Sequence, residues 1–238
     1  MDKILLVEDE DSIREMVTLN LKMDGYSIDP VASAEKALEL YNTDRNAYAL
    51  MLIDIMLPGM NGVELCQTIR KEDESVGIIM LTAKTQFNDK MVGFASGADD
   101  YITKPFSITE LLARVKAVSR RCTHRTGSQD TLTTTQGMFT IDMGSRMVKK
   151  NGRELNLTQV EFQLMKFFFE HEGLAVQRDE ILKAIWGENY YGDAKIVDVN
   201  IKRLRMKVED DPSSKPQYIL TVWGYGYRWD PSGKGLNE

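Results

Sequence analysis

A single carboxylate stands at the end of an apolar segment in the first half of the chain. Residues 50–53 are all hydrophobic, Asp54 follows them directly, and Pro58, Gly59 and Gly62 then favour a loop. In an α/β protein this pattern places the carboxylate at the carboxyl end of a buried parallel strand, the edge of the sheet where ligands bind. Asp54 is therefore predicted to belong to a functional site.

A second pair of acids follows another apolar segment in the same way. Residues 3–7 have the pattern of a buried strand, and Glu8 and Asp9 come directly after it. If the two strands are neighbours, three carboxylates converge, and their repulsion either raises their pKa values or recruits a divalent cation. Ligation by oxygen atoms alone suits Mg²⁺. The alternative is that Glu8 and Asp9 only stabilise the first turn of the following helix.

Two further strand ends carry groups that could bind an anion. Thr82 closes the apolar segment at residues 78–81, and Lys104 with Pro105 closes the segment at residues 101–103. A hydroxyl and an ammonium group at consecutive strand ends are suited to the oxygens of a phosphoryl group on Asp54. The Lys104–Pro105 bond is also a candidate for a cis peptide.

A repeated pattern of strands and helices positions these residues. Five strand candidates alternate with helical segments, and their centres lie near Ile4, Ile28, Leu52, Ile79 and Ile102. This alternation predicts a flavodoxin-like, doubly wound parallel sheet with the strand order 2-1-3-4-5. The second candidate is the least regular because a proline interrupts it. A flavin site is not expected, because acids follow the first strand where a phosphate-binding loop would stand.

The spacing of the strand-end residues resembles that of the receiver domain of bacterial response regulators. The resemblance covers residues 1 to about 121 and rests on Glu8, Asp9, Asp54, Thr82 and Lys104. It implies that Asp54 accepts a phosphoryl group from a phosphohistidine on a partner sensor histidine kinase, with Thr82 and Lys104 assisting.

The same resemblance implies a metal site and a switch. Glu8, Asp9, Asp54 and the backbone carbonyl of Met56 would hold Mg²⁺, which offsets charge during phosphoryl transfer. Tyr101 would change its rotamer when Thr82 moves toward the phosphoryl group. Without the resemblance, Tyr101 is equally well explained as a half-buried tyrosine.

Composition limits the location and the partners of the chain. It has 238 residues, 42% of them hydrophobic, and only two cysteines, which excludes a disulfide framework and favours a reducing cytosol. No apolar run approaches membrane-spanning length, so a cytoplasmic protein without a membrane partner is expected. The net charge of −6 arises in residues 1–122, with 14 basic and 20 acidic residues, whereas residues 123–238 have 16 of each.

The second half of the chain contains a helix rich in basic residues. After an Asn151–Gly152 hairpin turn, a capping box at residues 158–161 starts a helix whose apolar face holds Val160, Leu164, Phe167 and Phe168, and a second helix covers residues 178–186. In residues 194–209 the apolar positions recur at helical spacing, and basic side chains occupy the opposite face. Such a face suits insertion into the major groove of DNA, although a solvated charged face is the alternative.

The order of helix, helix, basic helix and hairpin resembles a winged-helix DNA-binding domain. The runs V-D-V-N-I-K-R-L-R-M-K-V-E-D-D-P and T-V-W-G-Y-G-Y-R-W are similar to those of the OmpR/PhoB class of response regulators. The resemblance implies double-stranded promoter DNA as a partner and RNA polymerase as a second one. The implied domains are a receiver at residues 1–122, a linker at 123–131 and a winged-helix domain at 132–232.

Several residues are implied to contact DNA or a second copy of the chain. Those matching DNA-contacting positions are Lys195, Lys202, Arg203 and Arg205, while two departures from the common pattern, Asn200 and Trp223, stand at further contact positions. Those matching a symmetric homodimer of phosphorylated receivers are the charged Lys90, Asp99, Asp100, Glu110, Arg114 and Arg121 and the apolar Met91, Phe94 and Leu112. The homodimer would raise the effective concentration of the second DNA-binding domain.

These features predict a non-enzymatic transcription regulator that is controlled by phosphorylation of Asp54. Two alternatives belong to other classes. One is an aspartyl-phosphate hydrolase in which Asp54 is the catalytic nucleophile. The other is a constitutive DNA-binding protein whose receiver serves only for dimerisation.

Overall fold

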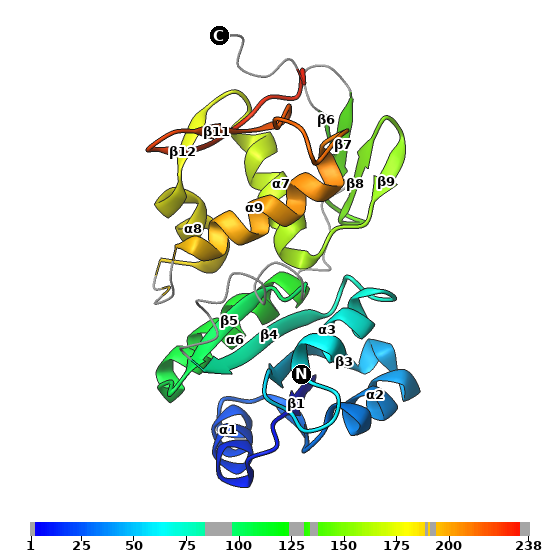
Figure 1. The fold of residues 1–238 in the computed structure, drawn as a ribbon, viewed down its shortest axis with the longest axis vertical. Coiled ribbons are helices and arrows are strands. Elements are labelled where there is room, and N and C mark those ends of the chain that lie inside the picture. The colour runs from blue at the N-terminus through cyan, green and yellow to red at the C-terminus, as the bar shows by residue number, and fades with distance from the viewer. Residues whose placement is uncertain are drawn as a thin grey trace. The chain divides into compact units, whose positions relative to one another are not determined.

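The computed structural model describes residues 3–83, 97–123, 131–133, 138–188, 190 and 194–233 (Figure 1). The chain divides into two compact units, Met1–His124 and Arg125–Glu238. Residues 124–130 of the predicted linker lie outside the described residues. Of the helices described, none is both long enough and apolar enough to cross a membrane.

The first unit is built on a parallel sheet of five strands. They are β1 (Lys3–Val7), β2 (Ser27–Val31), β3 (Tyr48–Asp54), β4 (Gly77–Ala83) and β5 (Asp100–Lys104). Their order is β2-β1-β3-β4-β5, and every pairing is parallel. The predicted flavodoxin-like order is confirmed. The proline in β2 is tolerated because β2 is an edge strand.

Helices flank this sheet and supply the rest of its core. They are α1 (Asp11–Met23), α2 (Ala34–Thr43), the short η1 (Arg45–Ala47), α3 (Gly62–Arg70) and α6 (Ile108–Thr123). The apolar faces of α1 and α6 join one face of the sheet in a single buried cluster. A capping box between Asn61 and Glu64 begins α3 directly after the loop that follows β3. The carboxyl ends of the strands are thereby left for the loops that carry the site.

The second unit begins with an antiparallel sheet, β6-β7-β8-β9. Its strands are β6 (Thr131–Thr133), β7 (Phe139–Asp142), β8 (Met147–Lys150) and β9 (Arg153–Leu155). Asn151 and Gly152 join β8 to β9 with φ angles of 50° and 76°, as the predicted type I′ turn requires.

The remaining elements form a helical layer and a hairpin. They are α7 (Gln159–Glu170), β10 (Ala175–Gln177), α8 (Arg178–Trp186), α9 (Lys195–Val208), β11 (Ile219–Val222) and β12 (Gly226–Trp229). The strands β10, β12 and β11 make a three-stranded sheet. Trp229 is fully buried among the rings of Phe139, Phe168 and Tyr218. This order of helices and hairpin confirms the winged-helix fold.

Candidate functional site

Three carboxylates meet at the carboxyl edge of the parallel sheet. Glu8 follows β1 and Asp54 ends the neighbouring β3, so the pairing of these strands brings them side by side. Oxygen atoms of Glu8, Asp9 and Asp54 lie within 4.8 Å of one another. Glu8 and Asp54 are buried, whereas Asp9 is exposed. The cluster is therefore open to solvent on one side.

Lys104 provides the positive charge in this cluster. Its Nζ lies 2.6 Å from Asp54 Oδ2, and 2.9 Å and 2.7 Å from Oε1 and Oε2 of Glu8. The following Lys104–Pro105 peptide bond is cis. Thr82 is buried near the carboxyl end of β4. This strand pairs with β5, which ends at Lys104. The structure thus gathers a nucleophilic carboxylate, an ammonium group and a hydroxyl at one sheet edge.

The electrostatics of the cluster favour binding of a cation. Burial, together with the charge of Asp54, raises the pKa of Glu8 to about 7, although the hydrogen bond from Lys104 opposes the shift. Burial opposes the charge on Lys104, but its bonds to Asp54 and Glu8 outweigh that effect and raise the Lys104 pKa. Two carboxylates thus share one ammonium group, and Asp9 adds a third carboxylate to the cluster. Their oxygen atoms are the ligand type that Mg²⁺ prefers, so the residues present fit this ion.

The loop after β3 is held close to Asp54. The backbone N–H of Met56 donates to Asp54 Oδ1 at 3.0 Å, which orients the carboxylate. A Cβ on Gly62 would lie 2.0 Å from the carbonyl oxygen of Asp54, so only glycine fits there. The side chain of Glu35, on α2, accepts a bond from the N–H of Met60 at 3.1 Å. Sequence reasoning missed Glu35 because nothing in its local pattern links α2 to this loop.

The switch residue Tyr101 lies on β5 beside these groups. It is 5% exposed, so its ring is turned into the first unit rather than toward solvent. This burial is compatible with the switch that the resemblance implies and also with an ordinary core tyrosine. Its role stays a prediction.

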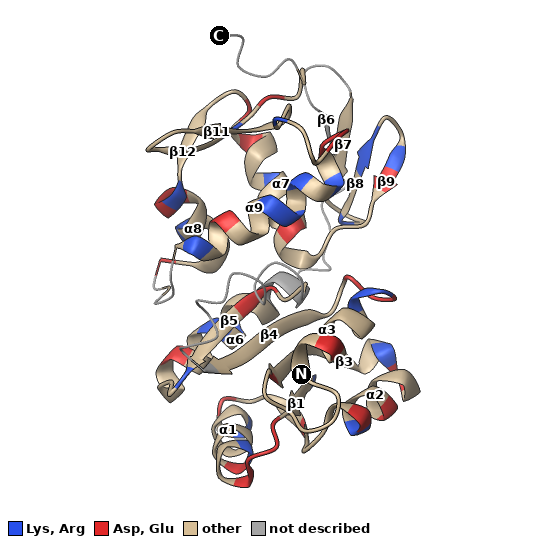
Figure 2. Cartoon of the chain, viewed as in Figure 1, with Lys and Arg blue, Asp and Glu red and all other residues tan. Residues whose placement is uncertain are grey.

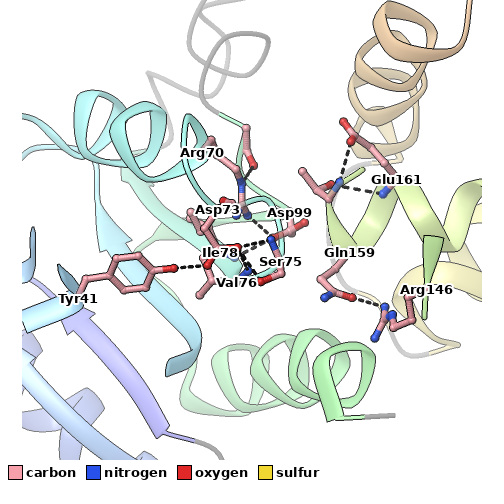
Figure 3. A network of polar contacts seen from close by, with 12 residues as sticks. Tyr41, Arg70, Asp73, Ser75, Val76, Ile78, Asp99, Arg146, Gln159 and Glu161 are labelled. Atoms are coloured by element: carbon pink, nitrogen blue, oxygen red, sulfur yellow. Dashed lines mark hydrogen bonds and ion pairs between the residues drawn. The ribbon is translucent and has the colours of Figure 1, made fainter. Parts of the chain in front are cut away.

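Three of the charges predicted to lie at a dimer surface form ion pairs inside the first unit. Asp99, 1% exposed, accepts bonds from Arg70 at 2.9 Å and from the N–H of Ile78 at 2.8 Å, as Figure 3 shows. Arg114, 5% exposed, donates to Asp100 at 2.9 Å, and Asp100 is fully buried. In the single chain these charges are therefore paired internally, and their role at a dimer surface of phosphorylated receivers stays a prediction.

The other predicted dimer residues fall into two groups. Glu110 bonds Arg114 at 2.7 Å on the same helix, and Leu112 packs against the buried cluster of the first unit. Lys90, Met91 and Phe94, and the side chain of Arg121, lie outside the described residues. The predicted dimer surface therefore stays a prediction.

The helix α9 presents a basic face in the second unit (Figure 2). Lys195 and Lys202 are exposed, and Arg203 is partly exposed. Asn200 is only 1% exposed and donates to the carbonyl of Ile196 at 2.9 Å. Its side chain belongs to the buried face of the helix, and the contact of Asn200 with DNA stays a prediction.

Arg205 braces α9 against the hairpin. Its Nε donates to the carbonyl of Ile219 at 2.9 Å, and its Nη2 donates to Thr221 Oγ1 at 2.9 Å. The guanidinium group lies 5.5 Å from the centre of the Tyr227 ring. Burial lowers the pKa of Arg205. Arg205 therefore has a structural role in the free chain, and its contact with DNA stays a prediction. Trp223, by contrast, is 91% exposed at the end of the hairpin.

Comparisons with known proteins match both units. The family model of the response regulator receiver domain matches residues 4–116, and the model described as "Transcriptional regulatory protein, C terminal" matches residues 152–229. A mutant of RitR is 27% identical, with 97% of this chain and 99% of that chain covered and a TM-score of 0.72. DrrB of Thermotoga maritima, described as an OmpR/PhoB homolog, is 32% identical, with 96% and 99% covered and a TM-score of 0.49.

Proposed function

This chain belongs to the OmpR/PhoB class of response regulators, and from that premise we propose that phosphorylation of Asp54 controls its binding to promoter DNA. A receiver domain implies a histidine kinase as the phosphoryl donor, and the C-terminal domain implies DNA as the partner. The observation that carries the proposal is the cluster at the sheet edge, where Lys104 Nζ lies 2.6 Å from Asp54. We further place the protein in the cytoplasm, as a regulator rather than an enzyme.

Phosphoryl transfer at this site is mainly a matter of position and charge. Asp54 attacks the phosphorus atom, and the bond between phosphorus and the kinase histidine breaks. Lys104 neutralises a phosphoryl oxygen, and the Thr82 hydroxyl donates a hydrogen bond to another. Glu8, Asp9, Asp54 and the carbonyl of Met56 would hold Mg²⁺, which when bound offsets negative charge on the transferring group.

The second half of the proposal concerns DNA and assembly. We expect Lys195 and Lys202, which are exposed on α9, to contact phosphates, and Arg203 on the same helix to read a base edge. We propose that phosphorylated receivers form a homodimer and that the DNA-bound protein contacts RNA polymerase. Asp99, Asp100 and Arg114, which form ion pairs within the single chain, are among the charged residues proposed for the dimer surface.

The experiment is a DNA-binding titration with and without a phosphoryl donor. A duplex carrying the promoter of the chain's own gene is titrated with the full chain, with Mg²⁺ and a small acyl phosphate present or absent. The donor is expected to increase the affinity of the wild type and to leave Asp54→Asn unchanged. Equal affinity for both proteins in both conditions would instead support a constitutive DNA-binding protein. Rapid multiple turnover of the acyl phosphate would support the hydrolase.

A further inference from the structure

The loop between β1 and α1 carries two of the three clustered carboxylates, and its backbone is held at both kinds of polar group. The N–H of Glu8 donates to the carbonyl of Val31 on β2 at 3.1 Å. The carbonyl oxygens of Glu8 and Asp9 both accept hydrogen bonds from Nη1 of Arg14 on α1, at 2.7 Å and 3.0 Å. One side chain therefore holds two consecutive peptide groups of this loop.

The guanidinium group of Arg14 is itself held in place. Its Nη2 forms an ion pair with Asp11, one turn earlier on α1. The side chain of Arg14 is 19% exposed, whereas that of Asp11 is 82% exposed, so Arg14 lies against the loop rather than in solvent. A guanidinium group carries five N–H donors in one plane, which lets it bond two carbonyls and a carboxylate together. The contact of Arg14 with the loop is thus directional, and it is more than a charge placed near acidic groups.

The three carboxylates differ in what orients them. Those of Glu8 and Asp54 accept hydrogen bonds from Lys104, at 2.7 Å and 2.6 Å. Asp9 is exposed, and in the part of the chain that the structure describes its carboxylate accepts no hydrogen bond. The direction of the Asp9 carboxylate therefore depends on the backbone that Arg14 holds.

We propose that Arg14 is a positioning residue for the cation site, which holds the peptide groups of Glu8 and Asp9 in place for Mg²⁺ before the ion binds. This inference rests on the proposed function, since it requires Mg²⁺ at the acidic cluster. Ligands that are already in place bind more tightly, because the loop need not be ordered when the ion arrives. Side chains that orient metal ligands typically change the affinity for the metal about 10–100-fold.

The charge of Arg14 and its positioning role predict opposite effects on Mg²⁺ affinity. A guanidinium group repels a cation bound nearby, so by charge alone its removal should strengthen Mg²⁺ binding. If the group fixes the ligands, its removal should weaken Mg²⁺ binding. Arg14→Met therefore separates the two roles by the direction of the change, and methionine is a good helix former that should preserve α1. Arg14→Lys keeps the charge and N–H donors but loses the planar fork.

The test is a calorimetric titration of the full chain with Mg²⁺. Arg14→Met is expected to bind Mg²⁺ about tenfold more weakly than the wild type, and Arg14→Lys should fall between the two. The matched control is Lys22→Met, which removes a positive charge from an exposed position further along α1. Charge at that distance is largely screened, so the control should stay within about twofold of the wild type. The rate of Asp54 phosphorylation by a small acyl phosphate at saturating Mg²⁺ should stay close to that of the wild type, because Arg14 changes only how much metal is needed.

A second readout follows the loop without any metal. In the metal-free chain, Arg14→Met should speed hydrogen exchange at the N–H of Glu8, because the strand end that pairs with Val31 is no longer held. Lys22→Met should leave that exchange unchanged. Wild-type or tighter Mg²⁺ affinity in Arg14→Met, or an unchanged exchange rate at Glu8, would overturn the inference and leave the proposed function standing. Failure of the wild type itself to bind Mg²⁺ would refute the proposed function, and the inference would fall with it.

Discussion

Replacing Arg114 with methionine tests whether its charge belongs to the interior of the receiver. Arg114 is 5% exposed and bonds Asp100, which is fully buried, and Glu110 on its own helix. Methionine keeps the length of the side chain but leaves the Asp100 carboxylate buried without this partner. Removing one member of a buried ion pair costs about 3–5 kcal/mol. With an m value of about 2 kcal/mol per molar, the urea midpoint of the first unit should fall by about 2 M.

The assay is pulsed hydrogen exchange across a urea series, read on full-chain peptides from β5 and α6. The matched control is Lys116→Met on the same helix, because the Lys116 side chain is 58% exposed in its pair with Asp24. That control should lose about 0–1 kcal/mol. The double variant Arg114→Met with Asp100→Asn should recover part of the stability. Equal and small losses of stability in Arg114→Met and in the control would refute the contribution of the internal ion pair to stability.

Three other outcomes follow from the structure. Gly62→Ala forces a Cβ against the Asp54 carbonyl oxygen, 2.0 Å away, so thermal melting should show about 1–3 kcal/mol of destabilisation and phosphorylation should slow. Arg205→Met removes the bonds to the hairpin and should destabilise the second unit by about 1.5–3 kcal/mol, as followed by tryptophan fluorescence. Calorimetric Mg²⁺ affinity should rise with pH through about 7, because burial raises the pKa of Glu8 to about 7 and the ion needs the carboxylate. In the metal-free chain the raised pKa of Glu8 contributes stability at low pH, and this contribution is lost as the pH rises toward 7. Glu8→Gln should therefore weaken the pH dependence of both the Mg²⁺ affinity and the stability.

The sheet and its order could be predicted from the sequence because the signals are local and repeated. Four of the five strands, β1, β3, β4 and β5, carry hydrophobic residues that run up to a polar residue, and strands of one parallel sheet share a carboxyl edge. The convergence of Glu8, Asp54 and Lys104 follows from that rule alone. The hydrogen bonds among these three side chains do not follow from it, because their rotamers depend on packing around the whole sheet edge.

It was harder to predict which polar side chains point inward, although the helical spacing indicates it. Arg114 stands three residues after Leu111 and four before Val118, both fully buried, so the helix turns Arg114 inward with them. In α9, Asn200 stands four residues before the buried Leu204 and is turned inward in the same way. Residue type alone suggested exposure, and position on the helix was the better guide.

Arg205 illustrates what sequence spacing could not supply. Its partners are a backbone carbonyl and a hydroxyl on β11, at Ile219 and Thr221, well over ten residues further along the chain. Nothing local in the helix indicates that a strand will return to this place. The sequence of α9 therefore gives no sign that Arg205 also holds the hairpin, and its contact with DNA stays a prediction.

The central claim is that Asp54 is the residue that accepts a phosphoryl group. The most direct measurement is mass spectrometry of the intact chain and its peptides after incubation with an acyl phosphate and Mg²⁺, in parallel with a known receiver domain. One phosphoryl group on the peptide containing Asp54, absent from Asp54→Asn and when Mg²⁺ is removed, is the predicted result. An unmodified wild-type chain under conditions that label the known receiver would contradict the claim.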